Sequence, residues 1–244
     1  MISNELILLT GANGYFGKAL CEGINNNYYI ASVVRQDELK INSKRNFHLK
    51  ADLSIENEIN NLPNKISDIC EKNNLRFKGI VNNACWVGNN DGPESSSDSY
   101  KGVFRSQIDI ILKLIPILEK NSSVINISSM YANVSPNPRN YDTYNHINPM
   151  EYGAMKAGLQ SATRWLSAVY CKKYNIRFNS ISFGPFPSPA NQSEQFNKKL
   201  SQNTHIGRIG NTNEVIGPVN FLLSDSSSYI TGSNLIVDGG WTAW

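Results

Sequence analysis

A tyrosine and a lysine stand four positions apart in the stretch EYGAMKAG, residues 151–158. On a helix such residues share one face, so Tyr152 and Lys156 would lie side by side. A free phenol, with a pKa near 10, is a poor acid or base at neutral pH. A lysine charge about 4 Å away contributes roughly 4 kcal/mol toward the phenolate, enough to lower the pKa of the tyrosine by about three units. The two residues are either an acid–base pair or a chance spacing on an ordinary helix.

The stretch TGANGYFG, residues 10–17, offers a second site for chemistry, the binding of phosphate groups. It follows an apolar run typical of a strand and opens a helical run, and its glycines permit a tight bend and close approach of a pyrophosphate. The free N–H groups and the positive dipole end of the following helix also favour an anion. The candidate cofactor-binding residues of this turn are Gly11, Asn13, Gly14, Tyr15 and Phe16.

Arg35 bears on the choice of cofactor because it follows the second predicted strand, residues 29–34. An NAD site places a carboxylate at this point to bind the ribose 2′-hydroxyl, whereas a guanidinium suits a 2′-phosphate in charge and geometry. The alternative is an exposed arginine at a strand end. We therefore expect NADP(H) to be preferred over NAD(H).

Short β-branched runs alternate with longer helical runs along the chain. The predicted strands are residues 6–10, 29–34, 48–52, 79–84, 123–128, 176–183 and 234–240, and the predicted helices are 18–24, 56–73, 100–120, 150–174 and 213–224. Strands that are apolar on both faces and alternate with helices predict a parallel sheet covered on both sides. We expect an α/β fold in a single domain, residues 1–244, with a doubly wound parallel sheet flanked by helices on both faces.

The composition excludes several other classes of protein. The chain is 40% hydrophobic and 18% charged, with a net charge of +3, and it has no basic run that would predict a nucleic-acid or membrane partner. The apolar run at 108–118 is too short to span a bilayer, and the start of the sequence has no pattern of a signal peptide. Four scattered cysteines and three distant histidines predict reduced thiols in a cytoplasmic protein and no metal site.

Eight short motifs, in this order, resemble those of the short-chain dehydrogenase/reductase family over nearly the whole chain. They are TGANGYFG (10–17), ADLS (51–54), NNAC (82–85), INISS (125–129), YGAMK (152–156), NSISFGPFPS (179–188), GRIGNTNEV (207–215) and SYITGSNLIVDGG (228–240). The resemblance implies a Rossmann-like fold and an NAD(P)-dependent oxidoreductase that interconverts a carbonyl and a secondary alcohol by hydride transfer.

The resemblance also implies the roles of individual residues. Ser129, Tyr152 and Lys156 would be catalytic, with Ser129 holding the carbonyl oxygen and Tyr152 acting as the general acid/base. Ser129 suits this role because it follows a predicted strand, and ligands of open α/β sheets bind at the carboxyl ends of strands. Besides the turn at 10–17, the implied cofactor contacts are Arg35, Asp52 and Leu53 at the adenosine end, Asn83 and Ala84 along the cofactor, Phe186 and Ser188 near the carboxamide, and Tyr152 and Lys156.

Four departures from the family pattern put parts of this assignment in question. Tyr15 stands where a small residue is preferred in the glycine turn, Cys85 replaces a glycine, and Phe183 replaces a proline. The asparagine that family members carry in the fourth helix is missing from its expected place. Gln107 is the nearest polar candidate to replace it.

The gap from Ser129 to Tyr152 is 23 positions (152 − 129), longer than is usual in the family, so residues 130–151 contain an insertion. The loop is either an ordered surface or subunit contact or a lid over the crevice, since long ordered loops are often functional. Its tyrosines and asparagines suit a polar sugar derivative. With the ending DGGWTAW, it is similar to members from bacterial surface-sugar and nonulosonate biosynthesis.

Two further functions remain open at this point, a sugar epimerase or dehydratase that uses transient hydride transfer and a catalytically silent cofactor-sensing protein. We also expect a small-molecule substrate and a closed homo-oligomer, a tetramer rather than a dimer. The expectation of an oligomer rests on the apolar residues Trp165, Leu166, Val169 and Tyr170 in one predicted helix and on Trp241 and Trp244 near the end of the sequence.

Overall fold

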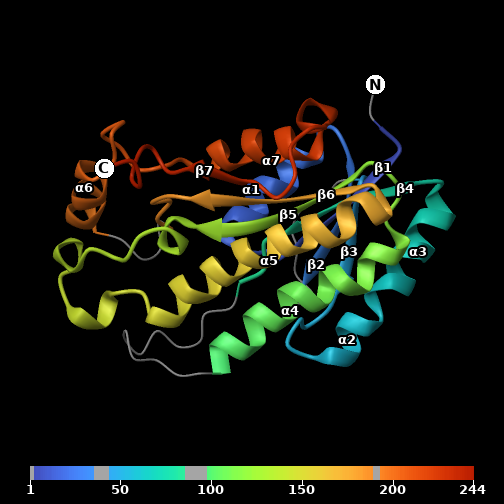
Figure 1. Ribbon diagram of the computed structural model, residues 1–244, viewed down its shortest axis with the longest axis horizontal. Helices are drawn as coiled ribbons and strands as arrows, with labels where there is room; N and C mark the ends of the chain where they lie inside the picture. The colour runs from blue at the N-terminus through green and yellow to red at the C-terminus, as the bar shows by residue number, and fades with distance from the viewer. Residues whose placement is uncertain (1–2, 36–43, 86–97, 189–192) are drawn as a thin grey trace.

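The computed structural model describes residues 3–35, 44–85, 98–188 and 193–244, and of residues 98–103 it describes the backbone alone. Its centre is a sheet of seven parallel strands in the order β3-β2-β1-β4-β5-β6-β7 (Figure 1). The strands are β1 (Glu5–Thr10), β2 (Tyr29–Val34), β3 (Asn46–Lys50), β4 (Arg76–Asn82), β5 (Ser122–Ser129), β6 (Ile176–Phe183) and β7 (Asn234–Val237). This is the predicted doubly wound, Rossmann-like α/β fold. The strand order reverses direction between β1 and β4, and such switch points are where ligands bind.

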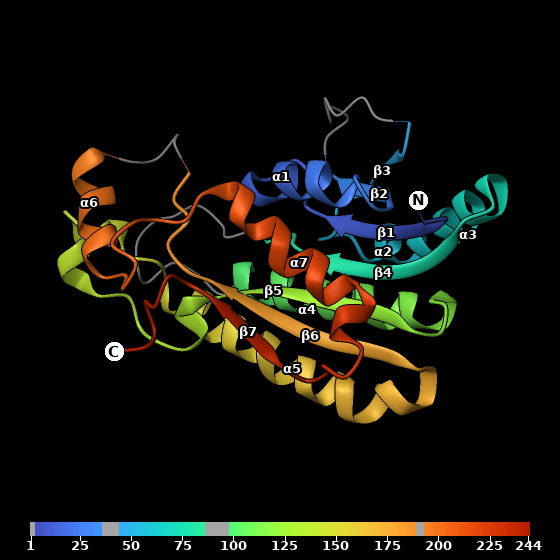
Figure 2. The same cartoon turned by 90° about the horizontal axis from the view of Figure 1, so that it is seen from above.

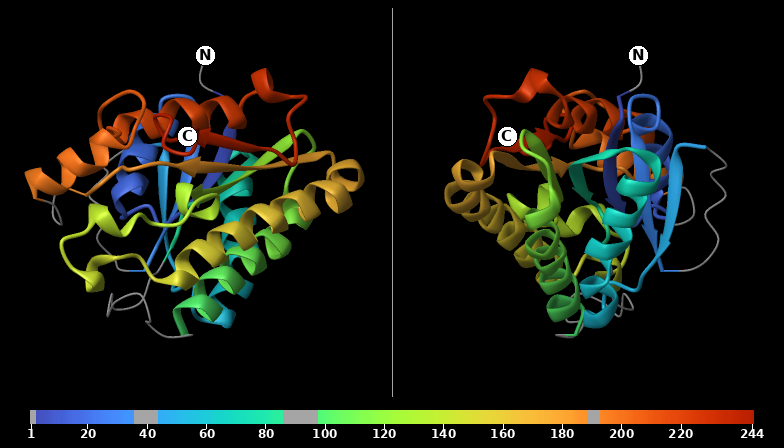
Figure 3. Two further views of the ribbon diagram at one scale, coloured as in Figure 1. Left: turned by 60° about the vertical axis from the view of Figure 1, so that its left-hand side comes forward. Right: turned by 90° about the vertical axis from the view of Figure 1, so that its right-hand side faces the viewer.

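Helices cover both faces of the sheet, as Figure 2 shows from above. One face carries α1 (Tyr15–Ile24) and α7 (Ile216–Leu223), and the other carries α2 (Glu56–Asn60), α3 (Leu62–Asn73), α4 (Asp98–Leu114) and α5 (Met150–Tyr174). The two long helices α4 and α5 lie along each other (Figure 3). A further helix, α6 (Glu194–Gln202), lies beyond the end of the sheet at which β5 and β6 finish (Figure 1).

Alternate residues of each strand enter two separate cores. In β1, Leu6 and Leu8 pack with the residues of α2 to α5, while Ile7 and Leu9 pack with α1 and α7. All four side chains are at most 1% exposed. A strand buried on both faces reads as a continuous apolar run, which is why the sequence predicted β1 correctly.

Several predicted elements have different limits in the structure, and three of them bear on the site. The helix α1 begins at Tyr15, three residues before the predicted start, and β3 lies two residues earlier than predicted. Strand β4 ends at Asn82 because the next two N–H groups, of Asn83 and Ala84, donate to the side chain of Thr10 instead of to a neighbouring strand. The helix α6 was not predicted at all. Its sequence EQFNKKLSQ is mostly polar, and only Leu200 is buried.

The apolar residues that predicted an oligomer divide into two groups. Trp165 and Val169 are 56% and 44% exposed on α5, and Trp244 is 83% exposed. Leu166, in contrast, is 1% exposed beneath the chain's own sheet, and Trp241 is 7% exposed against Met130, Tyr131 and Leu200 of the same chain. The expectation that a single chain would leave Trp241 exposed was therefore wrong. Among the helices that the structure describes, none has the length and apolar character that crossing a bilayer requires.

Candidate active site

The glycine turn between β1 and α1 has the geometry that the sequence predicted. Gly11 has a φ of +67°, and a Cβ added there would lie 2.8 Å from the Cα of Ala84. A Cβ at Gly17 would lie 2.1 Å from the carbonyl oxygen of Gly11, so only glycine lets α1 start this close to the turn. Gly14 occupies the N-cap of α1 and no described side chain caps it. The N–H groups of the first turn of α1 are therefore available to an anion.

Thr10, at the end of β1, connects this turn to the next motif. Its hydroxyl oxygen accepts hydrogen bonds from the N–H groups of Asn83, at 3.0 Å, and Ala84, at 2.9 Å, and its hydroxyl donates to Asn82 Oδ1 at 3.3 Å. The side-chain amide of Asn83 donates in return to the carbonyl oxygens of Thr10 and Gly11, both at 3.1 Å. The two motifs are thus held together as one polar surface at the carboxyl ends of β1 and β4.

A cavity of about 560 Å³ opens on this surface. It brings together most of the cofactor-binding residues that the sequence predicted, from the glycine turn to the Tyr–Lys pair. The predicted residues that line it are Gly11, Asn13, Gly14, Tyr15, Phe16, Arg35, Asp52, Leu53, Asn83, Ala84, Tyr152, Lys156 and Phe186. Ser129 and Ser188 are not among the lining residues.

The cavity also has lining residues that the sequence analysis did not assign: Val33, Val34, Ala51, Ser54, Cys85, Ser106, Ile127 and Ser128. Most of them adjoin a predicted motif residue, so adjacency was the available signal. Ser106 lies on α4 and adjoins none of these motifs, so only the packing of α4 reveals it.

Tyr152 and Lys156 share one face of α5, one helical turn apart. Lys156 is 2% exposed, and its ammonium donates to the carbonyl oxygen of Ile127 at 2.7 Å and lies 5.9 Å from the centre of the Tyr152 ring. Burial raises the pKa of Tyr152, and this outweighs the opposing effects of the Lys156 charge and of the Ser129 hydroxyl. The sequence predicted a lowered pKa from the spacing alone and did not account for desolvation.

Ser129 ends β5 and is 7% exposed. Its hydroxyl oxygen accepts a hydrogen bond from the N–H of Tyr131 at 3.2 Å, which caps the short 3₁₀ turn η2 (Met130–Ala132). The same hydroxyl interacts with Tyr152 and favours the phenolate. Ser129 is therefore next to the Tyr–Lys pair, as predicted, although the cavity wall itself is formed by the adjacent Ser128.

At the opposite end of the cavity, Arg35 and Asp52 follow β2 and β3. The hydroxyl and N–H of Ser54 donate to the carboxylate of Asp52 at 2.7 and 2.9 Å and lower its pKa, and the charge of Arg35 adds to this effect. Arg35 is exposed. Its guanidinium is therefore accessible to solvent, and its charge acts on Asp52 at this end of the cavity.

Gln107 of α4, the candidate to replace the missing asparagine, forms hydrogen bonds with the turn at 82–84. It is 1% exposed, and its side-chain amide donates to the carbonyl oxygen of Ala84 at 2.7 Å. Its own backbone carbonyl accepts a hydrogen bond from Asn82 at 2.9 Å, and its Oε1 has no partner within the described residues. Gln107 therefore supports the turn at 82–84, and no described hydrogen bond joins it to Lys156.

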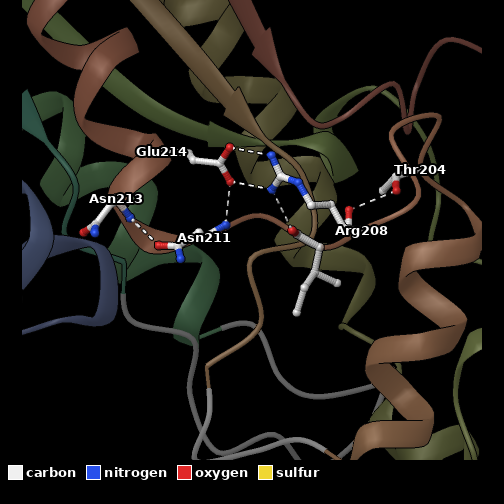
Figure 4. A network of polar contacts seen from close by, with 6 residues as sticks. Thr204, Arg208, Asn211, Asn213 and Glu214 are labelled. Carbon is white, nitrogen blue, oxygen red and sulfur yellow. Dashed lines mark hydrogen bonds and ion pairs between the residues drawn. The ribbon is translucent and has the colours of Figure 1, made fainter.

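An ion pair holds the turn that follows α6, as Figure 4 shows. The guanidinium of Arg208 donates twice to the carboxylate of Glu214, each at 2.7 Å, and the N–H of Asn211 donates to the same carboxylate at 2.8 Å. These bonds lower the pKa of Glu214 to about 2, with Arg208 the larger cause. Asn213 donates its N–H to Asn211, and the Thr204 hydroxyl donates to the carbonyl of Arg208.

The same turn positions Phe186, one of the predicted cofactor contacts. The N–H of Gly210 donates to the carbonyl of Pro185 at 2.9 Å, and a Cβ at Gly210 would lie 2.4 Å from the Phe186 ring. Phe186 packs edge-on against Phe16, with ring centres 5.4 Å apart. The motif GRIGNTNEV therefore packs against the loop that carries Phe186 and positions this lining residue of the cavity.

Comparison with known proteins agrees with this arrangement. A family model described as enoyl-(acyl carrier protein) reductase matches residues 27–242. The post-translational flagellin modification protein A of Campylobacter coli is 28% identical over 262 residues, which cover 99% of both chains. The NADH-dependent L-xylulose reductase of Ambrosiozyma monospora is 34% identical over 131 residues, or 51% of this chain and 45% of that protein.

Among solved structures, a short chain dehydrogenase from Leptospira borgpetersenii with bound NAD+ has a TM-score of 0.85 and 26% sequence identity. The match covers 99% of this chain and 94% of the other. Together, the sheet order, the cavity and the match of the family model over most of the chain establish the family. The chain belongs to the short-chain dehydrogenase/reductase family.

Proposed function

We propose that the protein interconverts a carbonyl group and a secondary alcohol on a polar sugar derivative, with NADP(H) preferred as its cofactor. The observation that carries the proposal is a cavity lined by both the glycine turn and the Tyr152–Lys156 pair. An anion-binding helix terminus and a half-buried phenol beside a buried ammonium, in one cavity, suit hydride transfer coupled to proton transfer. In this proposal the whole chain, residues 1–244, acts as one catalytic unit.

The residues present fit a dinucleotide. Its pyrophosphate would lie against Gly11 to Phe16, where no described side chain caps α1, and its adenosine against Asp52 and Leu53. Asn83 and Ala84 would follow its length, and Phe186 and Ser188 would hold the carboxamide. The bound dinucleotide supplies or accepts the hydride.

The proton is handled by the chain's own residues. Tyr152 would give or take the proton of the reacting oxygen, and Ser129 would hold that oxygen by a hydrogen bond. Burial keeps the phenol protonated at neutral pH, which suits it to donate a proton during reduction. In the opposite direction, the charge of Lys156 would stabilise the phenolate that forms.

The preference for NADP(H) rests on Arg35. An exposed guanidinium at the adenosine end of the cavity can pair with a 2′-phosphate, and it directly follows β2, where an NAD site would place a carboxylate. The names of the L-xylulose reductase and of the Leptospira structure both give the non-phosphorylated cofactor. The proposal is therefore specific to this chain, and it depends on that one side chain.

The proposed substrate class draws on the relatives and on the segment 130–151. One relative modifies flagellin after translation and another reduces L-xylulose, by their names. The segment carries polar and aromatic side chains between β5 and α5. We also propose a closed homo-oligomer, a tetramer rather than a dimer, since Trp165 and Val169 leave an apolar strip on the outer face of α5.

Tyr152→Phe tests the proposal because it keeps the ring and removes the proton. We expect turnover of a carbonyl substrate, followed by NADPH absorbance, to fall about 10²- to 10⁴-fold. NADPH affinity, measured by fluorescence, should stay within a few-fold of wild type. Tyr229, which is fully exposed and lies outside the segment 130–151, provides a matched control, and Tyr229→Phe should leave both values unchanged. Turnover of Tyr152→Phe close to wild type would contradict the assignment.

A further inference from the structure

Two tyrosines next to the candidate active site share a hydrogen bond that the proposed chemistry does not use. Tyr131 lies in η2, two residues after Ser129, and Tyr141 follows the short 3₁₀ turn η3 (Pro138–Asn140). Their hydroxyl oxygens are 2.7 Å apart. Tyr131 is 9% exposed. The pair is therefore a partly buried polar contact between η2, which directly follows β5, and the middle of the segment 130–151.

The inserted segment is fixed to helix α6 on either side of Tyr141. Three consecutive residues of the segment each contact a residue of α6 or the residue that ends it. The contacts are Asn203 Nδ2 to Asn140 Oδ1 at 3.1 Å, the Tyr141 and Phe196 rings with centres 5.7 Å apart, and Lys199 Nζ to Asp142 at 2.7 Å. These three contacts hold residues 140–142 against α6 and thereby position the hydroxyl of Tyr141.

The pair is close to Tyr152. A Cβ at Gly153 would lie 2.8 Å from the carbonyl oxygen of Tyr131, so only glycine at this point lets η2 approach the turn of α5 that carries Tyr152. Tyr131 and Tyr152 belong to one cluster with Met130, Leu200 and others. Burial is the main cause that raises the pKa of Tyr131 and of Tyr141, and a negative charge on Tyr152 raises both pKa values further. Both hydroxyls are therefore close enough to Tyr152 to interact with it electrostatically.

The two phenols together carry one more hydrogen-bond donor than their contact uses. Both phenols are protonated at neutral pH, since burial raises both pKa values above the usual value near 10. The contact between them uses one of the two protons. Within the residues that the structure describes, the remaining proton has no acceptor. A donor without an acceptor is costly away from water, so a bound molecule that offered an oxygen to this proton would be stabilised.

We propose that Tyr131 donates this hydrogen bond to a second oxygen of the substrate, and that Tyr141 is a positioning residue that holds Tyr131 by donating to it. The inference rests on the proposed function, in which Ser129 and Tyr152 already bind the reacting oxygen. Tyr131 is the donor to the substrate because it lies two residues after Ser129 and packs with Tyr152.

The surroundings of the pair indicate the chemical class of that substrate. Met130, Leu200 and Trp241 pack around Tyr131, and none of them carries a charge. The ammonium of Lys199, which lies on the helix beside the segment, is already paired with Asp142. A carboxylate or phosphate would call for a cation, whereas a neutral hydroxyl needs only a neutral donor. The substrate is therefore an uncharged carbonyl compound with at least one more oxygen, such as a ketose.

Matched pairs of ketones test the inference. Ketopentoses and ketohexoses, including L-xylulose, would be compared with 2-pentanone and 2-hexanone, which have the same carbon chains without hydroxyl groups. Wild-type protein should prefer the ketoses. Tyr131→Phe should lower kcat/KM for the ketoses about 10- to 100-fold, the range for one lost hydrogen bond with its donor, and change the simple ketones at most a few-fold. Tyr141→Phe should act in the same direction by a smaller factor.

The fully exposed Tyr229 is again the matched control, and Tyr229→Phe should leave both classes of ketone unchanged. An equal loss for ketoses and simple ketones in Tyr131→Phe would make the pair structural and overturn the inference. No loss for either class of ketone would overturn it as well, and it would mean that water accepts the spare proton. If the wild type reduced no compound of the panel, the proposed function itself would fail, and the inference with it.

Discussion

Replacing Thr10 with valine should separate the two motifs that form the floor of the cavity. Valine keeps the shape of threonine and replaces the hydroxyl by a methyl group. Thr10 is fully buried, and its hydroxyl serves the N–H groups of Asn83 and Ala84 and the amide oxygen of Asn82. The variant therefore removes three hydrogen bonds at once without creating a cavity, and Thr10→Ser, which keeps the hydroxyl, is its matched control.

The expected loss follows from those three bonds. Each is worth about 1 kcal/mol net, which gives an upper value of about 3 kcal/mol. Asn83 and Ala84 are only half-buried, so water replaces part of what their N–H groups lose. We expect the free energy of unfolding to fall by about 2 kcal/mol, which lowers Tm by about 4–8 °C in a chain of this size. NADPH affinity should fall as well, because the same two residues line the cavity.

Urea unfolding, followed by circular dichroism at one fixed protein concentration, would measure the difference in stability. Thr10→Ser should lie between the wild type and Thr10→Val, and close to the wild type. If Thr10→Val were as stable as the wild type, the hydroxyl would not be joining β1 to the turn at 82–84. The account of how the cavity floor is held together would then be wrong.

Three further predictions concern the cofactor, acid stability and assembly. If Arg35 binds a 2′-phosphate, NADPH should bind more tightly than NADH by roughly 10- to 150-fold, and Arg35→Asp should reverse the order, whereas equal affinities in the wild type would remove Arg35 from the site. Because the pKa of Glu214 is lowered to about 2, its contribution to stability should be full above pH 4.5 and be lost as the pH falls toward 2. Urea midpoints of wild type and Glu214→Gln should therefore differ at pH 6 and converge near pH 2, and a constant difference would contradict the role of the ion pair. Light scattering should give a multiple of the 27.2 kDa chain mass, and Trp165→Glu should lower it; a wild-type mass of one chain would refute the predicted oligomer.

The sheet could be predicted from the sequence because its strands are buried on both faces. Their continuous apolar runs, such as LILLT, are typical of a parallel sheet once helices alternate with them. Helix α6 could not be predicted in the same way, because it buries only Leu200 and its sequence is otherwise polar. Its place is set by contacts with the segment 130–151, which no local pattern contains.

In the candidate site, too, the features set by local geometry could be predicted, and those set by packing between distant segments could not. The spacing of Tyr152 and Lys156 predicted their shared face, and the glycine pattern predicted the turn at Gly11, because both depend on local geometry. The direction of the pKa shift of Tyr152 depends on how deeply the fold buries it, and spacing alone carries no such information. Gln107 likewise has its partner at Ala84 through the packing of α4 against β4, a contact between distant parts of the chain.

The hydrogen bond between Thr10 and Ala84 has a consequence for the order of events during folding. It joins residues that are 74 positions apart in the sequence. It can form only after β1 has paired with β4, since this pairing brings the two motifs together. Closing so long a segment costs chain entropy that local turns do not incur, and parallel pairing of this kind forms slowly. An early intermediate that contained α1 and the pair β1 and β2 would still lack a floor for the dinucleotide. The ability to bind the nucleotide would then arise only at the late step in which β4 docks, which makes the nucleotide a ligand of the nearly completed sheet and of no earlier species.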